Sequence, residues 1–286
     1  MAKLSVLTLT RNRTSYLKNL LEGLARSRRQ PDECIIVHMN EPANPTTDLS
    51  VSSLPFSCQH FTYTDPEVLL PLPQARNLAA AKSSGDILLF LDVDCIPSQE
   101  MLSAYEQACL AVPDAILMGQ VQYLPENANI DWRNNSTEIQ LSKLSKPHPK
   151  RDASGYPPLT VEQNYGLFWS LSFALQRSLF HKLGEFSRCY PSYGAEDTDF
   201  AWKARAQGVS LRWVPSAIAY HQFHTSSVPP WHNFDSIVYN AQIFYQRWGE
   251  WPMESWLTVF QETGHIEWDI AGDSLTVLKT PAHVPS

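Results

Sequence analysis

The chain has 286 residues, of which 43% are hydrophobic and 18% charged, a balance typical of a globular protein with a sizeable core. Its net charge of −7 argues against nucleic acid as a partner and against an anionic membrane as the main one, because both bind basic surfaces. The five cysteines form no CxxC pair, so we expect reduced thiols rather than a disulfide framework or zinc site. No apolar stretch is long enough for an integral membrane segment. We therefore expect a cytoplasmic protein, and peripheral membrane contact is compatible with this.

Strands and helices alternate through the first half of the chain, an order that predicts βαβ units with parallel strands. Between them, residues 41–55 are rich in Pro, Thr, Ser and Asn and predict a surface connection. The apolar runs predict strands at 4–9, 34–37, 59–64, 87–91 and 115–124. Helical spacing and good helix formers predict helices at 15–24, 74–82 and 98–110.

The second half begins with a long polar stretch, 125–163, which predicts a functional loop with one short helix near 138–144. Five of the nine tryptophans lie in the tail from residue 228, and we expect most of them to pack in a core or lid, or one or two to stack on sugar rings. Further predicted elements are a core strand at 165–175, a helix at 177–183, a helix running from 196 to Gly208, extended segments at 209–214 and 217–220, and tail helices at 233–248 and onward to 260.

Asp92 and Asp94 follow the buried strand 87–91 directly, with one valine between them. Alternate residues of an extended chain point the same way, so both carboxylates would share one face at the strand's C-terminal end, where open α/β sheets bind ligands. Two such carboxylates repel each other unless a cation lies between them, and a divalent ion that carries phosphate oxygens fits. The alternative is that these aspartates merely end the strand as turn formers.

A second acidic cluster, Glu196, Asp197 and Asp199, begins the helix that ends at Gly208. One or two carboxylates would serve a helix N-terminus, so three indicate a further role, such as accepting the proton of an attacking hydroxyl group. His221 follows the later extended segment. An imidazole there would complete a mixed oxygen and nitrogen ligand set suited to manganese.

Three motifs, in this order, resemble the GT-A glycosyltransferases, most closely the family 2 group. They are Leu-Thr-Arg-Asn-Arg at 9–13, Ala-Arg-Asn at 75–77 with Gly-Asp-Ile-Leu-Leu-Phe-Leu-Asp-Val-Asp at 85–94, and Gly-Ala-Glu-Asp-Thr-Asp-Phe at 194–200. The resemblance implies a GT-A fold of the α/β class, Rossmann-like, with a mostly parallel central sheet flanked by helices. We expect a catalytic domain at 1–225 and a C-terminal helical, Trp-rich extension at 226–286 packed on it.

The resemblance also implies where the donor, a nucleotide-diphosphate sugar, would bind. Thr10 and Arg13 would lie at the nucleotide, and Arg76 near its phosphates. Asp92 would contact the ribose or a metal-bound water, or act as a metal ligand. Asp94 would bind Mn²⁺ or Mg²⁺ bridging the diphosphate.

On the acceptor side, the resemblance implies that Asp197 would be the general base, with Glu196 holding the acceptor or sharing the role. The acceptor would be a glycan, a glycolipid or another hydroxyl compound. His221 would be the third metal ligand, with His224 as second choice. One base without an enzymic nucleophile implies inversion at the anomeric carbon.

One departure concerns the nucleobase. Family 2 members usually carry an acidic residue after the second strand, where this chain reads His-Met-Asn-Glu at 38–41, so a uridine donor would require Glu41 or Asp65 to take that role. The alternatives are a sugar-nucleotidyltransferase, although residues 8–14 lack glycine, and a catalytically inactive sugar-nucleotide-binding protein. A DxD phosphatase ranks lower, because its nucleophile would follow the first strand.

Overall fold

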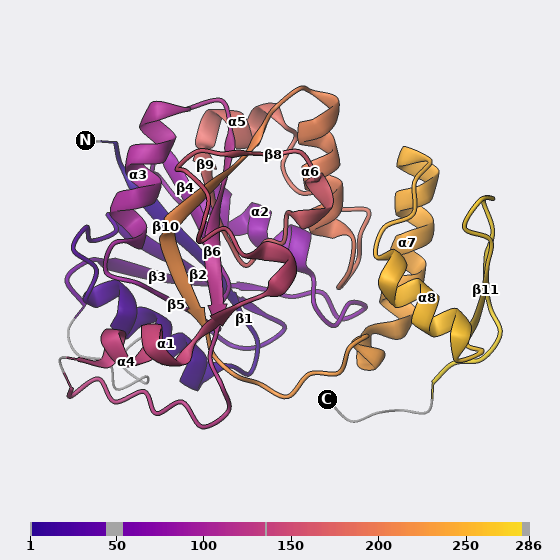
Figure 1. The fold of residues 1–286 in the computed structure, drawn as a ribbon, viewed down its shortest axis with the longest axis horizontal. Helices are drawn as coiled ribbons and strands as arrows, with labels where there is room; N and C mark the ends of the chain where they lie inside the picture. Colours follow the sequence, from indigo (N-terminus) through magenta and orange to yellow (C-terminus); the bar gives the residue numbers. More distant parts are fainter. Residues whose placement is uncertain (1, 44–53, 135, 282–286) are drawn as a thin grey trace.

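The computed structural model describes residues 2–43, 54–134 and 136–281, so most of the surface connection predicted at 41–55 lies outside the described residues. Its centre is one sheet of mixed direction with the strand order β3-β2-β1-β4-β9-β6-β10-β5 (Figure 1). The strands on this path are β1 (Leu4–Thr10), β2 (Glu33–Met39), β3 (Ser57–Tyr63), β4 (Ile87–Leu91), β5 (Cys95–Pro97), β6 (Ile116–Tyr123), β9 (Ser172–Gln176) and β10 (Leu211–His221). Two short strands extend it, with β7 (Lys146–Pro147) beside β6 and β8 (Val161–Glu162) beside β10.

Helices cover both faces of the sheet, and each face has its own apolar core. On one face, α1 (Thr14–Ala25) and α3 (Met101–Ala111) pack against the sheet through residues such as Leu20 and Met101. The other face is covered by α2 (Leu72–Lys82), α5 (Arg177–Lys182) and α6 (Glu196–Ala206). Strand β4 is buried along its whole length because it contributes to both cores. The predicted α/β fold with a mostly parallel sheet is confirmed.

Two details differ from the sequence-based expectations. The strand predicted at 165–175 is a 3₁₀ turn, Tyr165–Leu167, followed by the shorter β9, which runs antiparallel to both of its neighbours. The two extended segments at 209–220 form the single strand β10, whose register against β6 shifts between Val214 and Ile218. Apolar patterns show which residues are buried, but strand direction and pairing depend on the chain's later path.

The long segment after β6 crosses the surface and contains α4 (Thr137–Leu144), close to where a helix was predicted. It then passes through a 3₁₀ turn, Pro149–Arg151, before it reaches β8. Besides β7 and β8, this loop carries no other strand among its described residues, 125–134 and 136–163.

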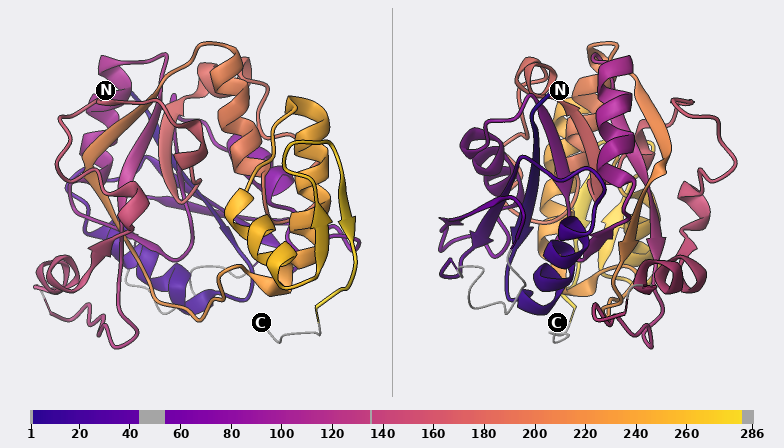
Figure 2. Two further views of the ribbon diagram at one scale, coloured as in Figure 1. Left: turned by 45° about the vertical axis from the view of Figure 1, so that its right-hand side comes forward. Right: turned by 90° about the vertical axis from the view of Figure 1, so that its left-hand side faces the viewer.

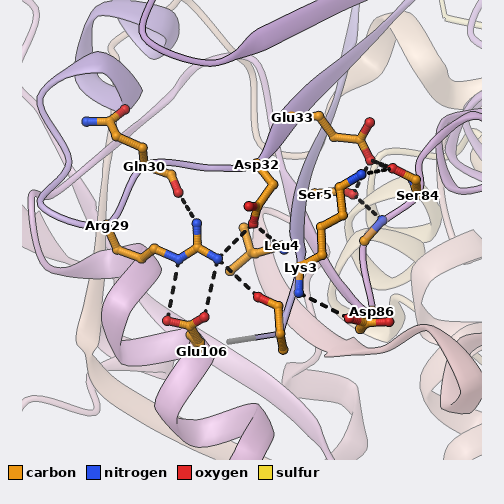
Figure 3. A network of polar contacts seen from close by, with 12 residues as sticks. Lys3, Leu4, Ser5, Arg29, Gln30, Asp32, Glu33, Ser84, Asp86 and Glu106 are labelled. Carbon is orange, nitrogen blue, oxygen red and sulfur yellow. Dashed lines mark hydrogen bonds and ion pairs between the residues drawn. The ribbon is translucent and has the colours of Figure 1, made fainter.

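A polar network joins the N-terminal ends of β1 and β2 to neighbouring segments (Figure 3). Arg29 pairs with Asp32 at 2.8 Å and with Glu106 of α3 at 3.2 Å. The Ser5 hydroxyl donates to Glu33 at 2.6 Å, which ties β1 to β2. These contacts hold the N-terminal ends of the parallel strands together, and they do not involve the C-terminal ends.

The C-terminal segment contains α7 (Phe234–Trp248), α8 (Glu254–Glu262) and a hairpin of β11 (Ile266–Trp268) and β12 (Leu275–Val277). It has its own apolar cluster, in which Trp251 and Trp268 are buried, while α7 lies beside α6 (Figure 2). The predicted helical, tryptophan-rich extension is confirmed; the hairpin was not predicted. Within the described ranges, no helix is both long and apolar enough to cross a bilayer.

Candidate active site

The carboxylate of Asp94 and two imidazoles meet at the C-terminal edge of the sheet. Asp94 lies in the tight turn between β4 and β5, while His221 ends β10 and His224 follows it. This arrangement results from pairing of β10 with β5, in which His221 is the register partner of Cys95. Nε2 of His221 is 3.5 Å from Asp94 Oδ1, and Nε2 of His224 is 3.4 Å from Asp94 Oδ2.

Arg13, from the loop after β1, also reaches Asp94. Its Nη1 donates to Asp94 Oδ2 at 2.6 Å. Burial opposes ionisation of Asp94, but the charge of His221, a hydrogen bond from His224 and the charge of Arg13 together lower the pKa of this carboxyl. Asp94 is therefore held as a carboxylate although it is only 7% exposed.

This cluster fits a divalent cation. One carboxylate oxygen and two imidazole nitrogens, one from each residue, lie within 4.8 Å of one another. Asp94 Oδ1 is buried, accepts no hydrogen bond from the described residues and lies 3.5 Å from His221 Nε2, so it can still accept a further partner. Burial also lowers the pKa of His221, which favours the neutral imidazole that binds metals. The mixed oxygen and nitrogen set is one that Mn²⁺ accepts.

Asp92 lies on the other side of the same turn and faces a different set of charges. Burial raises the pKa of Asp92 to about 7; the Arg76 guanidinium opposes this rise, and the carboxylates of Asp94, Glu196 and Asp197 add to it. The turn between β4 and β5 replaces the extended geometry that predicted a shared face. Asp94 belongs to the histidine cluster, whereas Asp92 lies between that cluster and the acidic residues of α6.

Glu196 is held by a buried ion pair. Arg76 of α2 is 5% exposed and places Nη1 3.0 Å from Glu196 Oε1, while its Nη2 donates to the Ser170 hydroxyl at 2.8 Å. The second oxygen, Oε2, accepts from the amide of Gly194 at 2.9 Å. Both carboxylate oxygens of Glu196 therefore have hydrogen-bond partners, and Arg76 is the one that carries a charge.

Asp197 is more accessible than Glu196 and differs in its partners. It is half-buried, and its carboxylate accepts from the backbone amides of Ser170 at 3.3 Å and Thr198 at 2.7 Å. Backbone amides orient the Asp197 carboxylate without pairing it with a positive charge. Because the residue is also partly exposed, an acceptor hydroxyl group could reach it. Of the two acidic residues, this geometry favours Asp197 as the proton acceptor.

A cleft of about 670 Å³ opens at the C-terminal ends of β1, β2 and β3. Arg11, Glu41 and Asp65 are among its lining residues, so both acidic candidates for nucleobase recognition border the same space. The Asn12 amide donates to Glu41 Oε2 at 2.5 Å, and His38 Nδ1 lies 3.1 Å from Glu41 Oε1. The loop at 11–13 therefore borders the cleft at Arg11 and reaches Asp94 through Arg13. Thr10 is buried at the end of β1, and its predicted nucleotide contact stays a prediction.

Sequence reasoning named the charged residues of the site but missed the groups that orient them. Ser170, which contacts both Arg76 and Asp197, follows a stretch with no polar motif. His38, which pairs with Glu41 and with His60, lies in the segment 38–41 after the predicted second strand, and the sequence predicts no role of its own for it. No local pattern marks Ser170, because both of its partners are distant in the chain, and the contact of His38 with His60 joins two different strands.

Comparison with known proteins identifies the family and the fold. The family model described as "Glycosyl transferase family 2" matches residues 5–174. The fold is shared with crystal structures of GalNAc-T7 with UDP, GalNAc and Mn²⁺ (TM-score 0.59, 17% identity, 86% of this chain and 50% of that one) and of S. aureus TarS 1–349 (TM-score 0.58, 16% identity, 84% and 64%). These matches confirm the GT-A architecture.

The chain belongs to glycosyl transferase family 2, as the motifs indicated. Its relatives include a chondroitin synthase of Pasteurella multocida (strain Pm70), 25% identical over 51% of this chain and 17% of that protein. Another is a validoxylamine A glucosyltransferase of Streptomyces hygroscopicus subsp. limoneus, 22% identical over 73% and 49% respectively. The chain thus spans about half or less of the length of the curated relatives it matches.

Proposed function

We propose that this chain transfers a sugar from a nucleoside diphosphate sugar to a hydroxyl acceptor, with inversion at the anomeric carbon. The observation that carries the proposal is that Asp92 lies within reach of the charges of both the Asp94 cluster and the acidic residues of α6. The Asp94 cluster fits a cation, and the α6 carboxylates supply a base. A solved relative in fold, TarS, has been crystallised with UDP-GlcNAc, which supports a uridine diphosphate sugar as the first donor class to test.

On the donor side, the cleft between Arg11 and Asp65 would hold the nucleoside, with Glu41 or Asp65 accepting from the base. Asp94, His221 and His224 would hold Mn²⁺ or Mg²⁺. Such an ion, when bound, supplies positive charge that stabilises the leaving diphosphate.

On the acceptor side, the hydroxyl oxygen attacks the anomeric carbon as the bond to the diphosphate oxygen breaks, and Asp197 takes the hydroxyl proton. Glu196, fixed by Arg76, would position the acceptor. The rings of Tyr193 and Trp256 are stacked with centroids 6.1 Å apart. Burial raises the pKa of Tyr193, and the nearby charges of Glu196 and Asp197 raise it further. This aromatic pair beside the base favours an acceptor with a sugar ring, such as a glycan or glycolipid.

Two substitutions separate this function from its alternatives. Asp94→Asn should abolish Mn²⁺-dependent stabilisation by nucleotide sugars in a thermal-shift assay, where a ligand at 100 times its Kd adds about 2.7 kcal/mol. Asp197→Asn should keep that stabilisation and lose release of nucleoside diphosphate from the donor. Asp114→Asn is the matched control, because Asp114 is exposed at the opposite end of β6.

The outcomes distinguish the candidate functions. No stabilisation of the unaltered chain by any donor would refute the transferase proposal. Donor binding without turnover in the presence of diverse hydroxyl acceptors would favour an inactive binding protein. Formation of a nucleotide sugar from a sugar phosphate and a nucleoside triphosphate would instead favour a nucleotidyltransferase.

A further inference from the structure

The turn that delivers Glu196 and Asp197 has an unusual backbone. Gly194 has φ of +106° and Ala195 has φ of +63°, so two consecutive residues before α6 lie at positive φ. A residue with a side chain rarely adopts such a conformation unless its surroundings impose it. Ala195 therefore requires contacts that hold the turn in place.

Those contacts come from α7, in the C-terminal segment. Asn240 is completely buried, and its Nδ2 approaches three successive backbone carbonyls of the turn, those of Ser192 at 3.1 Å, Tyr193 at 3.3 Å and Gly194 at 2.8 Å. Reversing this amide would set Oδ1 against three carbonyl oxygens, so electrostatics select the orientation with Nδ2 toward the turn.

The acceptor half of the same amide is unused. Asn240 Oδ1 is buried and receives no hydrogen bond from the described residues. A buried carbonyl without a donor costs free energy, and an apolar residue at this position would avoid that cost. An asparagine at position 240 is thus accounted for by its Nδ2 group, which donates to the carbonyls of the turn.

The helix is also fitted to the turn by shape. A Cβ added to Gly194 would lie 3.3 Å from Ile237 Cγ1 and 3.2 Å from Met253 Sδ, so α7 and the start of α8 approach the glycine closely. The Gly194 amide donates to Glu196 Oε2, which connects the turn directly to the acidic pair.

We propose that Asn240 is a positioning residue for the catalytic carboxylates: the α7 amide holds the 192–195 turn, and the turn fixes the start of α6 at Glu196 and Asp197. This inference rests on the proposed function and extends it, because it makes the C-terminal extension part of the catalytic apparatus. The hydrogen bonds of Asn240 to described residues all go to the turn and none to the Asp94 cluster, so its loss should affect turnover and leave donor binding intact.

The test compares Asn240→Leu, which keeps the volume and removes the donor, with Gln242→Leu. Gln242 lies on the same helix and donates to the carbonyl of Leu275 at 2.8 Å, away from the turn. In Asn240→Leu we expect Mn²⁺-dependent donor affinity within about twofold of wild type and kcat lower by about 10–100-fold, since a small misplacement of a reacting group has an effect of this size. Gln242→Leu should change neither.

Hydrogen exchange of the peptide 192–197 supplies a readout that does not depend on activity. Exchange should accelerate in Asn240→Leu and stay unchanged in Gln242→Leu. If Asn240→Leu does not fold, Asn240→Ala is measured in the same way. Unchanged kcat in a folded variant, a parallel loss of donor affinity and kcat, or unchanged exchange at 192–197 would each overturn the inference. Absence of donor binding and turnover in the wild-type chain would overturn the proposed function instead.

Discussion

The buried ion pair between Arg76 and Glu196 allows a quantitative prediction. The two side chains belong to residues that are 5% and 4% exposed, and Arg76→Met would leave the Glu196 carboxylate buried without its cation. Removing one partner of a buried pair costs about 3–5 kcal/mol. A chain of this length loses about 2 °C of Tm for each kcal/mol, so we expect a decrease of roughly 6–10 °C.

The pH dependence tests the cause of that loss. Burial raises the pKa of Glu196, the charge of Asp197 raises it further, and Arg76 opposes both effects. Without Arg76 the pKa of Glu196 rises further above its unfolded value, so the folded state binds more protons and loses stability as the pH increases. The decrease in Tm should therefore be smaller at pH 5 than at pH 8.

A second substitution tests whether the unpaired Glu196 carboxylate causes the loss of stability. Combining Arg76→Met with Glu196→Gln removes the unpaired charge and should recover at least half of the lost Tm, measured by differential scanning calorimetry. Arg133→Met is the control, because the Arg133 side chain is 91% exposed and its pair with Asp131 should not affect Tm. A decrease in Tm that is independent of pH and additive in the double variant would refute the reasoning.

Two further predictions concern residues outside the active site. A hydrogen bond with the Cys34 thiol, reinforced by His60, lowers the pKa of Cys58 to about 6. The rate of Cys58 alkylation by iodoacetamide, followed by mass spectrometry of the labelled peptide, should therefore be half-maximal near pH 6. A midpoint above pH 8 would contradict this. Gly85→Ala should destabilise the chain by about 1–3 kcal/mol in urea unfolding, because the new Cβ would lie 2.7 Å from the Ser5 amide nitrogen. Gly155→Ala, where the Cβ meets open space, should be neutral, and equal effects at the two glycines would argue against the steric cause.

Most of the longer helices and strands, and the charged residues of the site, could be predicted from the amino-acid sequence alone. Five apolar residues before Asp92 identified β4 as a buried strand, because only a strand covered on both faces is apolar throughout. The acidic residues at the start of α6 and the histidine at the end of β10 could be named because strand ends and helix starts are local features. The family motifs were sufficient to predict the fold class that the structure and the comparisons confirm.

Which of these groups lie together depends on how distant segments of the chain pack in the folded protein. Asp94 faces His221 because β10 pairs with β5, a strand of three residues that no periodicity could reveal. The placement of Arg76 near the donor phosphates stays a prediction, and the contact of its Nη1 with Glu196, 120 residues away in the chain, could not be read from the sequence. Asn240 reads in the sequence as an ordinary polar residue of a helix; its burial against the 192–195 turn depends on how α7 docks. Pairing between distant segments depends on packing and strand order, and local sequence patterns do not encode these.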